Sequence, residues 1–271
     1  MNPLPDMNTE SQPNLNTESQ PKINLSFDEQ LKYLKLGYTL RHHAELSAEA
    51  AKKRWSHVEF LRRVIEAETH ERQAHALERR LRAARFPVRK SLDQFRWDWP
   101  HQINEPQVRH LFELGFAKEH TNVVFCGGVG LGKSHLATAL GYAACQAGHA
   151  VLFTTAVDAI NALVAAQAAH RLQVELKKYL APAVLVLDEV GYLPLDKSGA
   201  DLLFQIVSQR YERGSLIVTT NKAYKHWAGI FNNDAGITAA ILDRLLHRAT
   251  TVVIEGSSYR MKDRNPEEPL A

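Results

Sequence analysis

Cysteine and long apolar runs are scarce in this sequence of 271 residues. Its two cysteines, Cys126 and Cys145, fit neither a metal site nor a disulfide framework, and their apolar neighbours predict buried packing residues rather than redox chemistry. No apolar stretch approaches the roughly 20 residues that a membrane helix needs. The polar N-terminus also lacks the apolar core of a secretory signal. We therefore expect a cytoplasmic protein that does not contact a membrane.

The overall composition is that of an ordinary globular protein, with 45% hydrophobic and 23% charged residues. A chain of this length can bury one large domain or two unequal ones. The formal net charge of +3 permits a polyanionic partner without requiring one. The position of that charge along the chain is more informative than its total.

Both ends of the chain are polar. The hexapeptide Asn-Thr-Glu-Ser-Gln-Pro occurs twice, at residues 8–13 and 16–21, in a segment with almost nothing to bury. Such a composition predicts a disordered tail over residues 1–25. At the other end, residues 265–271 are predicted to form a second, frayed tail.

Helical signals begin directly after the first tail. Ser26 with Glu29 forms a capping box, the arrangement that marks a helix start. Ser56 with Glu59 forms a second one, which opens a long helical stretch that Pro87 should end. The N-terminal third is therefore predicted to be a small all-helical domain.

This predicted domain, residues 26–90, is strongly basic between Lys52 and Lys90, where twelve basic residues stand against five acidic ones. The basic residues are Lys52, Lys53, Arg54, Arg62, Arg63, Arg72, Arg79, Arg80, Arg82, Arg85, Arg89 and Lys90. Contact with the backbone of duplex DNA is one interpretation, since cations there displace condensed counterions. The other is a solvated helix surface with pairs such as Glu68 with Arg72.

A connector is predicted over residues 91–120, where Phe95, Trp97 and Trp99 precede Pro100. We expect these aromatic side chains to pack against the following domain. Stacking of the two tryptophans on nucleic acid bases is the alternative.

From Thr121 onward, apolar runs alternate with helical patterns. Buried strands joined by helical crossovers form a parallel α/β sheet. The expected strands cover residues 122–126, 150–153, 183–187, 216–219 and 251–254, and the expected helices 133–147, 157–170, 198–212 and 237–247. This five-stranded domain is predicted to span residues 121–264.

A phosphate-binding motif lies between the first strand and its helix. Its residues are Gly127, Gly128, Val129, Gly130, Leu131, Gly132, Lys133 and Ser134, which satisfy G-x-x-x-x-G-K-[ST]. The glycines let backbone N–H groups converge on phosphate oxygens, and the helix N-terminus adds its positive end. Lys133 is expected to neutralise the β and γ phosphates of ATP, and the Ser134 hydroxyl to ligate Mg²⁺.

Two carboxylates follow the third apolar run. Asp188 and Glu189 stand at the carboxyl end of a predicted strand, where ligands bind in such sheets. Asp188 is expected to hold Mg²⁺ through its water shell, and Glu189 to polarise the water that attacks the γ-phosphate. The sequence therefore predicts an ATP-hydrolysing site.

Two later residues are further candidates. Asn221 ends the fourth apolar run, which we place between the strands that carry the phosphate loop and the carboxylates. It is predicted to hold the attacking water or a γ-phosphate oxygen, although asparagine after a strand is often a turn former. Arg244 lies on an amphipathic helix and could reach the ATP of a neighbouring subunit, where such an arginine speeds phosphoryl transfer. Its alternative role is a surface pair with an aspartate.

The order of these elements resembles that of the AAA+ ATPases, in the branch that contains IstB-like transposition helper ATPases and DnaC-like helicase loaders. The resemblance covers about residues 26–264, and the helical N-terminal segment is more similar to that of IstB. Its specific passages are residues 127–136, 187–192, 219–221, 242–246 and 258–260.

This resemblance implies an ASCE-type P-loop sheet, flanked by helices, without a C-terminal lid, since few residues follow the last strand. It also implies the residue roles given above, with Asn221 as γ-phosphate sensor, Arg244 as intersubunit arginine finger, and Arg260 as a further phosphate or DNA contact. The implied protein assembles with ATP into homo-oligomers on duplex DNA and assists a cognate transposase. A DnaC-like helicase loader, a small-molecule kinase and a non-hydrolysing ATP switch are the alternatives.

Overall fold

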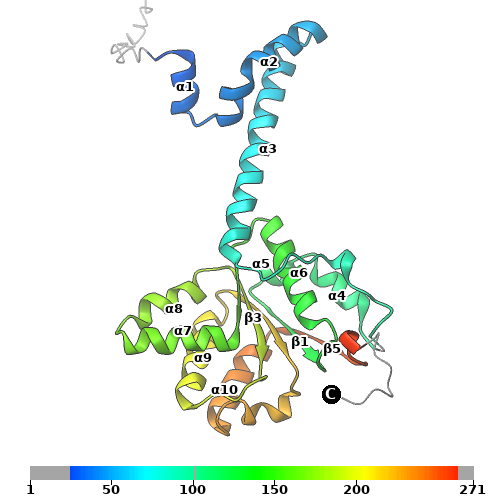
Figure 1. Ribbon diagram of the computed structural model, residues 1–271, viewed down its shortest axis with the longest axis vertical. Helices are drawn as coiled ribbons and strands as arrows, with labels where there is room; N and C mark the ends of the chain where they lie inside the picture. The colour runs from blue at the N-terminus through cyan, green and yellow to red at the C-terminus, as the bar shows by residue number, and fades with distance from the viewer. Residues whose placement is uncertain (1–24, 101, 262–271) are drawn as a thin grey trace, which may run out of the picture. The chain divides into compact units, whose positions relative to one another are not determined.

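The structure is a computed structural model that describes residues 25–100 and 102–261 (Figure 1). The chain divides between Gln73 and Ala74 into two compact units. The predicted tails at residues 1–25 and 265–271 lie outside the described residues, Leu25 excepted.

The first unit is helical. It contains α1 (Phe27–Tyr33), α2 (Gly37–Lys53) and the first part of α3 (His57–Ala84). The predicted capping box is present at α1, where Ser26 and Glu29 exchange side-chain to backbone hydrogen bonds. At α3, the Glu59 backbone N–H donates to the Ser56 hydroxyl at 3.2 Å, as the second box predicts.

Glu68 fastens α2 to α3 within this unit. Its buried carboxylate accepts hydrogen bonds from the backbone N–H groups of Gly37 and Thr39, each at 3.1 Å, and from the Thr39 hydroxyl at 3.3 Å. These donors lie in the first turn of α2, where backbone N–H groups lack partners within the helix. Burial alone would raise the pKa of Glu68, but the hydrogen bonds from Thr39, Arg72 and Gly37 outweigh it and lower that pKa.

The second unit contains a five-stranded, all-parallel sheet in the order β2-β3-β4-β1-β5, which confirms the predicted fold class (Figure 1). The strands are β1 (Asn122–Gly127), β2 (Val151–Thr155), β3 (Val184–Val190), β4 (Ser215–Thr220) and β5 (Ala249–Ile254). Because all strands are parallel, their carboxyl ends share one edge of the sheet.

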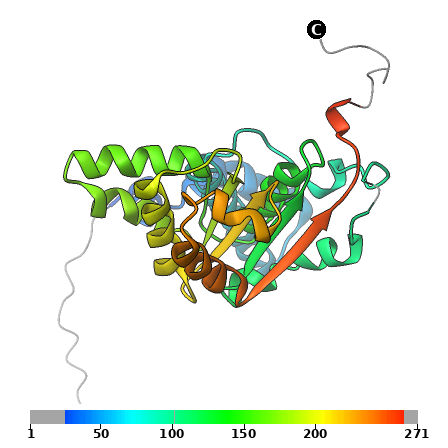
Figure 2. The same ribbon diagram turned by 90° about the horizontal axis from the view of Figure 1, so that it is seen from below.

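Helices cover both faces of the sheet. They are α4 (Glu105–Leu111), α5 (Gly115–Lys118), α6 (Lys133–Gln146), α7 (Ala156–Ala168), α8 (Leu172–Leu180), α9 (Lys197–Arg210) and α10 (Ala235–Leu246). Short 3₁₀ helices are η1 (Leu92–Gln94), η2 (Tyr224–Gly229) and η3 (Tyr259–Met261). In Figure 2, α7 to α10 and α4 to α6 lie on opposite sides of the strands.

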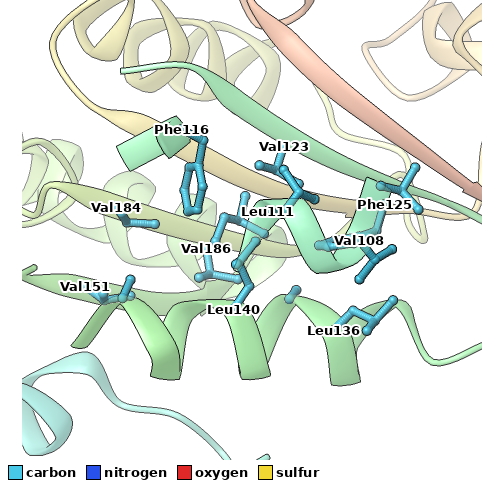
Figure 3. Packing of buried hydrophobic residues seen from close by; sticks show 14 of the residues in the cluster. Val108, Leu111, Phe116, Val123, Phe125, Leu136, Leu140, Val151, Val184 and Val186 are labelled. Carbon is cyan, nitrogen blue, oxygen red and sulfur yellow. The ribbon is translucent and has the colours of Figure 1, made fainter. Parts of the chain in front are cut away.

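Successive residues of a strand point to opposite faces of the sheet and pack into two separate hydrophobic cores. Val123 and Phe125 pack with α4, α5 and α6, whereas Val124, between them, packs with the helices of the other face. Figure 3 shows Leu136 and Leu140 of α6 directed at the strands in the first of these cores. The buried strands therefore hold the loops at their carboxyl ends between two packed helical layers.

Arg210 fixes the amino-terminal edge of the sheet. Its side chain is 2% exposed, at the end of α9, and burial lowers its pKa to about 10. Its guanidinium donates hydrogen bonds to the backbone carbonyls of Tyr179, Leu180, Pro182, Ala183 and Ser215. One arginine thus joins the end of α8 to the starts of β3 and β4.

Three elements differ from the sequence-based expectation. The long helix α3 ends at Ala84, before Pro87, because Arg85 adopts a left-handed conformation with φ 58°. The segment 91–120 contains the short helices α4 and α5, and α8 follows the predicted helix that ends near residue 170. The α4 start carried a readable signal, since Asn104 caps it and a proline stands in its first turn.

After β5, the described residues form only the short helix η3, so this part of the chain contains no helical lid, as predicted. Among residues 25–100 and 102–261, no helix is long and apolar enough to cross a bilayer.

Candidate active site

The phosphate loop joins β1 to α6 and contains all eight predicted motif residues. Gly130 and Gly132 have φ of 76° and 84°, in the left-handed region that favours glycine. A Cβ at Gly130 would lie 2.0 Å from the Ser258 hydroxyl oxygen, and one at Gly132 would lie 2.6 Å from the Phe95 ring. The backbone of the loop is therefore shaped for glycine and closely covered by other segments.

Lys133 begins α6 and is 3% exposed. Its ammonium donates a hydrogen bond to the Gly128 carbonyl at 2.6 Å and lies 5.9 Å from the centre of the Tyr192 ring. Burial lowers the pKa of Lys133, while the Asp188 carboxylate acts in the opposite direction. Burial also raises the pKa of Tyr192, together with the charges of Glu189 and Asp188. The ammonium thus lies at the loop, close to where the motif places phosphates.

Asp188 links the phosphate loop to the centre of the sheet. It is 6% exposed, and its Oδ1 accepts a hydrogen bond from the Ser134 hydroxyl at 2.9 Å and another from the Thr219 hydroxyl. The structure therefore brings together Ser134 and Asp188, the two residues predicted to hold Mg²⁺. Two hard oxygen donors in contact are the ligand type that this ion prefers.

Glu189 differs from Asp188 in both exposure and backbone conformation. Its side chain is exposed, and its φ of 61° is unusual for a residue other than glycine. The β3–β4 register shifts between Leu187 and Val190, so Glu189 lies in an irregularity of the strand. The Glu189 backbone N–H donates to the Thr219 hydroxyl at 2.9 Å. This distortion directs one carboxylate outward while its neighbour stays buried.

Asn221 follows β4, which lies between β3 and β1 as the sequence predicts. Its side-chain Oδ1 is buried, and no group among the described residues donates a hydrogen bond to it. A buried acceptor of this kind requires a partner. Asn221 therefore has an unused acceptor at the carboxyl edge where Asp188 and Glu189 also lie.

A cavity of about 390 Å³ opens at this edge. Its walls come from the phosphate loop, the end of β3, the connector and the segment after β5. The lining includes Lys90, Phe95, Arg96, Trp99, Gly130, Lys133, Ser134, His135, Glu189, Tyr192, Tyr259 and Arg260. A cavity of this size, lined both by phosphate-loop residues and by aromatic rings, has room for a nucleotide.

The connector aromatics pack within this unit, as predicted. Trp97 packs against the core and contacts Phe95, with ring centroids 4.9 Å apart. The Trp99 indole N–H donates to the Ser257 carbonyl at 2.9 Å, and its ring meets Tyr259 edge-on at 5.3 Å. Burial lowers the pKa of His135, which hydrogen-bonds the Ser91 carbonyl at 2.9 Å and meets Phe95.

Arg244 does not line this cavity. Its guanidinium donates to the Ala240 carbonyl at 2.9 Å and lies over the Phe204 ring at 5.2 Å. Within the described residues it forms no salt bridge with an aspartate or glutamate, which was the alternative role considered for it. Arg244 therefore keeps hydrogen-bond donors free on the surface of α10.

Many cations of the basic helices are paired. Arg62 and Arg63 both contact Glu59, and Lys53 contacts Glu49. Arg72 contacts Glu68, Arg82 contacts Glu78, and Arg80 donates to the Cys145 carbonyl. No ion pair among the described residues involves Lys52, Arg54, Arg79, Arg85, Arg89 or Lys90. This second group carries uncompensated charge, and so does Arg80, because a backbone carbonyl does not neutralise its guanidinium.

Thr219 is the site residue that sequence reasoning overlooked. Its hydroxyl contacts both Asp188 and the Glu189 backbone, yet nothing local in the β4 sequence distinguishes it from other strand threonines. The feature that could have identified Thr219 is its position directly before Thr220 and Asn221, on the strand next to the one that carries the carboxylates. The sequence alone likewise does not predict that residues of the connector line the cavity.

A five-stranded parallel sheet in this order, with a phosphate loop at the end of β1 and paired carboxylates at the carboxyl end of β3, is the fold of the AAA+ type of P-loop proteins. The family model described as IstB-like ATP binding protein matches residues 29–266, and the chain belongs to this family.

Two relatives agree with this family assignment, and one solved structure shares the fold. The chain is 40% identical to a protein of Pseudomonas aeruginosa named as an ATP-binding protein of insertion sequence IS21, over 86% of this chain and 88% of that one. It is 37% identical to the corresponding protein of insertion sequence IS5376 from Geobacillus stearothermophilus, over 79% and 84%. The crystal structure of the DnaC helicase loader shares the fold, with a TM-score of 0.51 and 24% identity over 61% of this chain and 96% of that one.

Proposed function

We propose that this protein binds and hydrolyses ATP, assembles with ATP on duplex DNA, and assists a transposase. The contact of the Ser134 hydroxyl with buried Asp188, beside the outward Glu189 carboxylate, is the observation that carries the proposed hydrolysis. Family membership and the relatives named for insertion sequences support the biological role.

ATP binding is assigned to the phosphate loop and Lys133. The Lys133 ammonium now donates to the Gly128 carbonyl and would exchange that partner for β- and γ-phosphate oxygens. Backbone N–H groups at the start of α6 add further donors and the positive end of the helix dipole. The aromatic rings of Phe95, Trp99 and Tyr259 supply an apolar wall for the base.

Mg²⁺ fits the paired oxygens of Ser134 and Asp188. When bound there, Mg²⁺ neutralises charge that develops on the phosphates. Thr219 donates to the same Asp188 oxygen as Ser134, so the Ser134 hydroxyl and the carboxylate are held in place before the nucleotide arrives.

Hydrolysis is assigned to Glu189, which accepts a proton from water as the water oxygen attacks the γ-phosphorus. The bond from that phosphorus to the bridging oxygen of ADP breaks, and ADP and phosphate leave. Asn221 does not line the cavity, but its Oδ1 is a buried acceptor at the same edge of the sheet with no donor among the described residues, and we assign it the orientation of the same water. Thr219 acts as a positioning residue through the Glu189 backbone.

Assembly would complete this site. Arg244 lies outside the cavity of its own chain and has no acidic partner in the described residues, so its guanidinium is available to a neighbouring subunit's γ-phosphate. An arginine supplied in this way can raise the rate by about 10³ to 10⁵. Mixing Arg244→Ala with Glu189→Gln subunits tests this role, because a mixture contains sites with both groups intact. We expect turnover from the mixture and little from either variant alone; an inactive mixture contradicts the assignment.

DNA contact is assigned to the unpaired cations of the basic helices. Lys52 and Arg54 lie at the end of α2, where Arg63 and Lys53 also lie over the Trp55 ring at 4.3 and 5.7 Å. We expect Lys52→Ala with Arg54→Ala to weaken duplex binding and to reduce the log–log salt dependence by about 0.9 for each DNA phosphate that the variant no longer neutralises.

The matched control changes a cation that already has a partner. Lys53→Ala removes a residue paired with Glu49 in the same turn, and we expect a smaller effect on the salt dependence. An unchanged salt dependence in the double variant would contradict DNA contact at this end of α2. The helicase-loader alternative rests on the shared fold alone, whereas the insertion-sequence relatives match most of the chain at higher identity.

The experiment that tests the enzymatic assignment compares Lys133→Ala with Glu189→Gln. We expect Lys133→Ala to lose ATP binding and assembly, because the phosphates lose their buried cation. We expect Glu189→Gln to retain binding and to accumulate the ATP-bound assembly, because only the proton acceptor is lost. Equal loss of ATP binding in both variants would contradict these roles.

A further inference from the structure

We propose that a groove along β2 binds an extended, basic peptide segment of a partner protein, which pairs with β2 as an added strand of the sheet. This inference goes beyond the proposed ATPase activity, because it assigns a protein-binding site to the free side of an edge strand. Binding there does not require ATP, so it can be measured on the nucleotide-free protein.

The backbone of β2 has one side without a neighbouring strand, because the sheet order ends at β2. The Val184 N–H donates to the Ala150 carbonyl at 3.1 Å, and β2 continues from there in parallel register with β3. Since residues of a parallel strand alternate between its two sides, the backbone groups of Val151 and Phe153 point away from β3. Their N–H groups meet no acceptor among residues 25–100 and 102–261 on that outer side. Such an edge can pair with a further strand.

A groove of about 700 Å³ runs along this edge, and every residue of β2 lines it. One wall comes from α7 and α8, on one face of the sheet, and includes Asp158, Glu175 and Tyr179. The other wall comes from the end of α3 and the residues after it, on the opposite face, and includes Arg85 and Pro87. An added strand as long as β2, about 16 Å, would therefore lie between two walls.

Tyr179 offers an unused hydrogen-bonding group to this groove. Its side chain is only 6% exposed, and no hydrogen bond among the described residues involves its hydroxyl. Burial raises the pKa of Tyr179, the carboxylates of Glu175 and Asp158 raise it further, and Arg85 acts in the opposite direction. The hydroxyl thus lies among charged groups of both walls. A buried polar group of this kind requires a partner, which a bound peptide would provide.

The charges of the groove favour a basic segment. Four carboxylates and two cations line it, namely Asp158, Glu175, Asp188 and Glu189 with Arg85 and Lys178. Lys178 is already paired with Glu175 at 2.5 Å, whereas Asp158 forms no ion pair among the described residues. Segments 1–24 and 262–271 of this chain each contain more acidic than basic residues, and the β2 edge of a second copy would bring the same carboxylates. Charge complementarity therefore points to a different, basic chain.

The two walls also predict the pattern of the bound segment. Successive side chains of an added strand point to opposite faces of the sheet. Basic side chains on the α8 side would meet Asp158 and Glu175, and the alternate, apolar side chains would meet Pro87 on the other side. Because the groove extends to Glu189, the segment would lie beside the carboxylate to which we assign hydrolysis, and this last point alone rests on the proposed function.

The probe for the test is a fluorescein-labelled synthetic peptide of alternating lysine and valine, about six residues long, the usual length of a strand. Fluorescence anisotropy measures its binding to the nucleotide-free, full-length protein at low salt. One comparison peptide is N-methylated at every residue, which keeps its charge and removes its backbone donors. The other has glutamate in place of lysine. We expect both to bind at least about tenfold more weakly than the probe.

The matched variants change the charge of the groove without changing the strand. Asp158→Asn combined with Glu175→Gln removes two charges from one wall, and we expect it to bind the probe about threefold to tenfold more weakly. Asp201→Asn combined with Glu212→Gln is the control, because these exposed acids do not line the groove, and it should bind as wild type does. A melting temperature within a few degrees of wild type shows that each variant is folded.

Hydrogen exchange locates the bound peptide on the wild-type protein, where the probe should slow exchange at the Val151 and Phe153 amides. Unchanged exchange there, wild-type affinity in the groove variant, or no binding of the probe would overturn the proposal. Equal affinity for the N-methylated peptide would show that attraction of charge, rather than strand pairing, holds the probe, and would also overturn it. Slower exchange caused by duplex DNA but not by the probe would make the groove a nucleic acid contact instead. None of these measurements uses ATP, so a failure of the proposed ATPase function leaves them unaffected.

Discussion

Replacing Thr219 by valine removes one hydroxyl group from the centre of the site and keeps the volume of the side chain. Thr219 is fully buried on β4, donates to Asp188 and accepts the Glu189 backbone N–H at 2.9 Å. The substitution therefore leaves one carboxylate with fewer donors and one backbone N–H without its acceptor. Valine also suits a buried strand, so the strand itself should form normally.

The size of the effect follows from the two lost hydrogen bonds. A hydrogen bond to a charged group contributes about 1.5–3 kcal/mol, and a buried group left without a partner costs about 1–3 kcal/mol. We expect Thr219→Val to lower the free energy of unfolding by about 2–4 kcal/mol. Because Glu189 is held in a left-handed conformation beside Thr219, its carboxylate should also lose its fixed direction. ATP turnover should fall about tenfold to a hundredfold.

The assay combines urea unfolding, ATP affinity and steady-state hydrolysis on the same protein preparations. ATP affinity should change little, because Lys133 and the loop glycines are untouched. Thr219→Ser is the control that keeps the hydroxyl, and it should retain most of the turnover. Wild-type turnover in Thr219→Val, measured under conditions where the variant is fully folded, would refute the positioning role of Thr219.

Three further predictions concern stability and reactivity. Glu68→Ala should destabilise the first unit by about 2–3 kcal/mol and speed hydrogen exchange at the start of α2, whereas Glu66→Ala, an exposed site on the same helix, should not. The pKa of Glu68 in the folded protein lies below its usual 4.5, so this stabilisation is fully present at pH values above the pKa of the unfolded protein. It is lost as the pH falls through the lower pKa of the folded protein. A first unit whose stability does not change with pH in this range would contradict the prediction. Arg210→Met should lower the free energy of unfolding by about 3 kcal/mol or more, since five backbone carbonyls lose their donor; a decrease under about 1 kcal/mol in urea unfolding would show that water replaces it. Burial raises the pKa of Cys145 to about 11, so mass spectrometry should find it unmodified by iodoacetamide near neutral pH in the folded protein and modified after unfolding; rapid labelling when folded would contradict the packing.

The parts of the site that the sequence predicted are those carried by short contiguous segments. The phosphate loop and the Asp188-Glu189 pair each follow an apolar strand, and local pattern is sufficient to place both. The position of β4 between β3 and β1 also agrees with the expectation for Asn221. In contrast, the Thr219 hydroxyl reaches the carboxylates only because β4 lies next to β3, and the order of strands in the sheet is a property of the tertiary structure.

The elements that the sequence missed are short and depend on packing. Helix α4 has seven residues, too few to be stable alone, and it forms where Val108 and Leu111 enter the core. The excess of basic residues in these helices is read correctly from the sequence. The structure adds that some of these cations already have an acidic partner, since Arg62 and Arg63 share the Glu59 carboxylate. That pairing was readable from the spacing of three and four residues.

The proposed DNA-assembled ATPase is tested by steady-state ATP hydrolysis of the wild-type protein, with and without duplex DNA, at low salt and across a range of protein concentrations. Glu189→Gln serves as the blank for contaminating activity. We predict that duplex stimulates hydrolysis and that the rate rises more steeply than in proportion to protein, because in the proposed assembly Arg244 of one subunit completes the site of another. Hydrolysis that is indifferent to DNA and strictly proportional to protein, or that persists in Glu189→Gln, would contradict it.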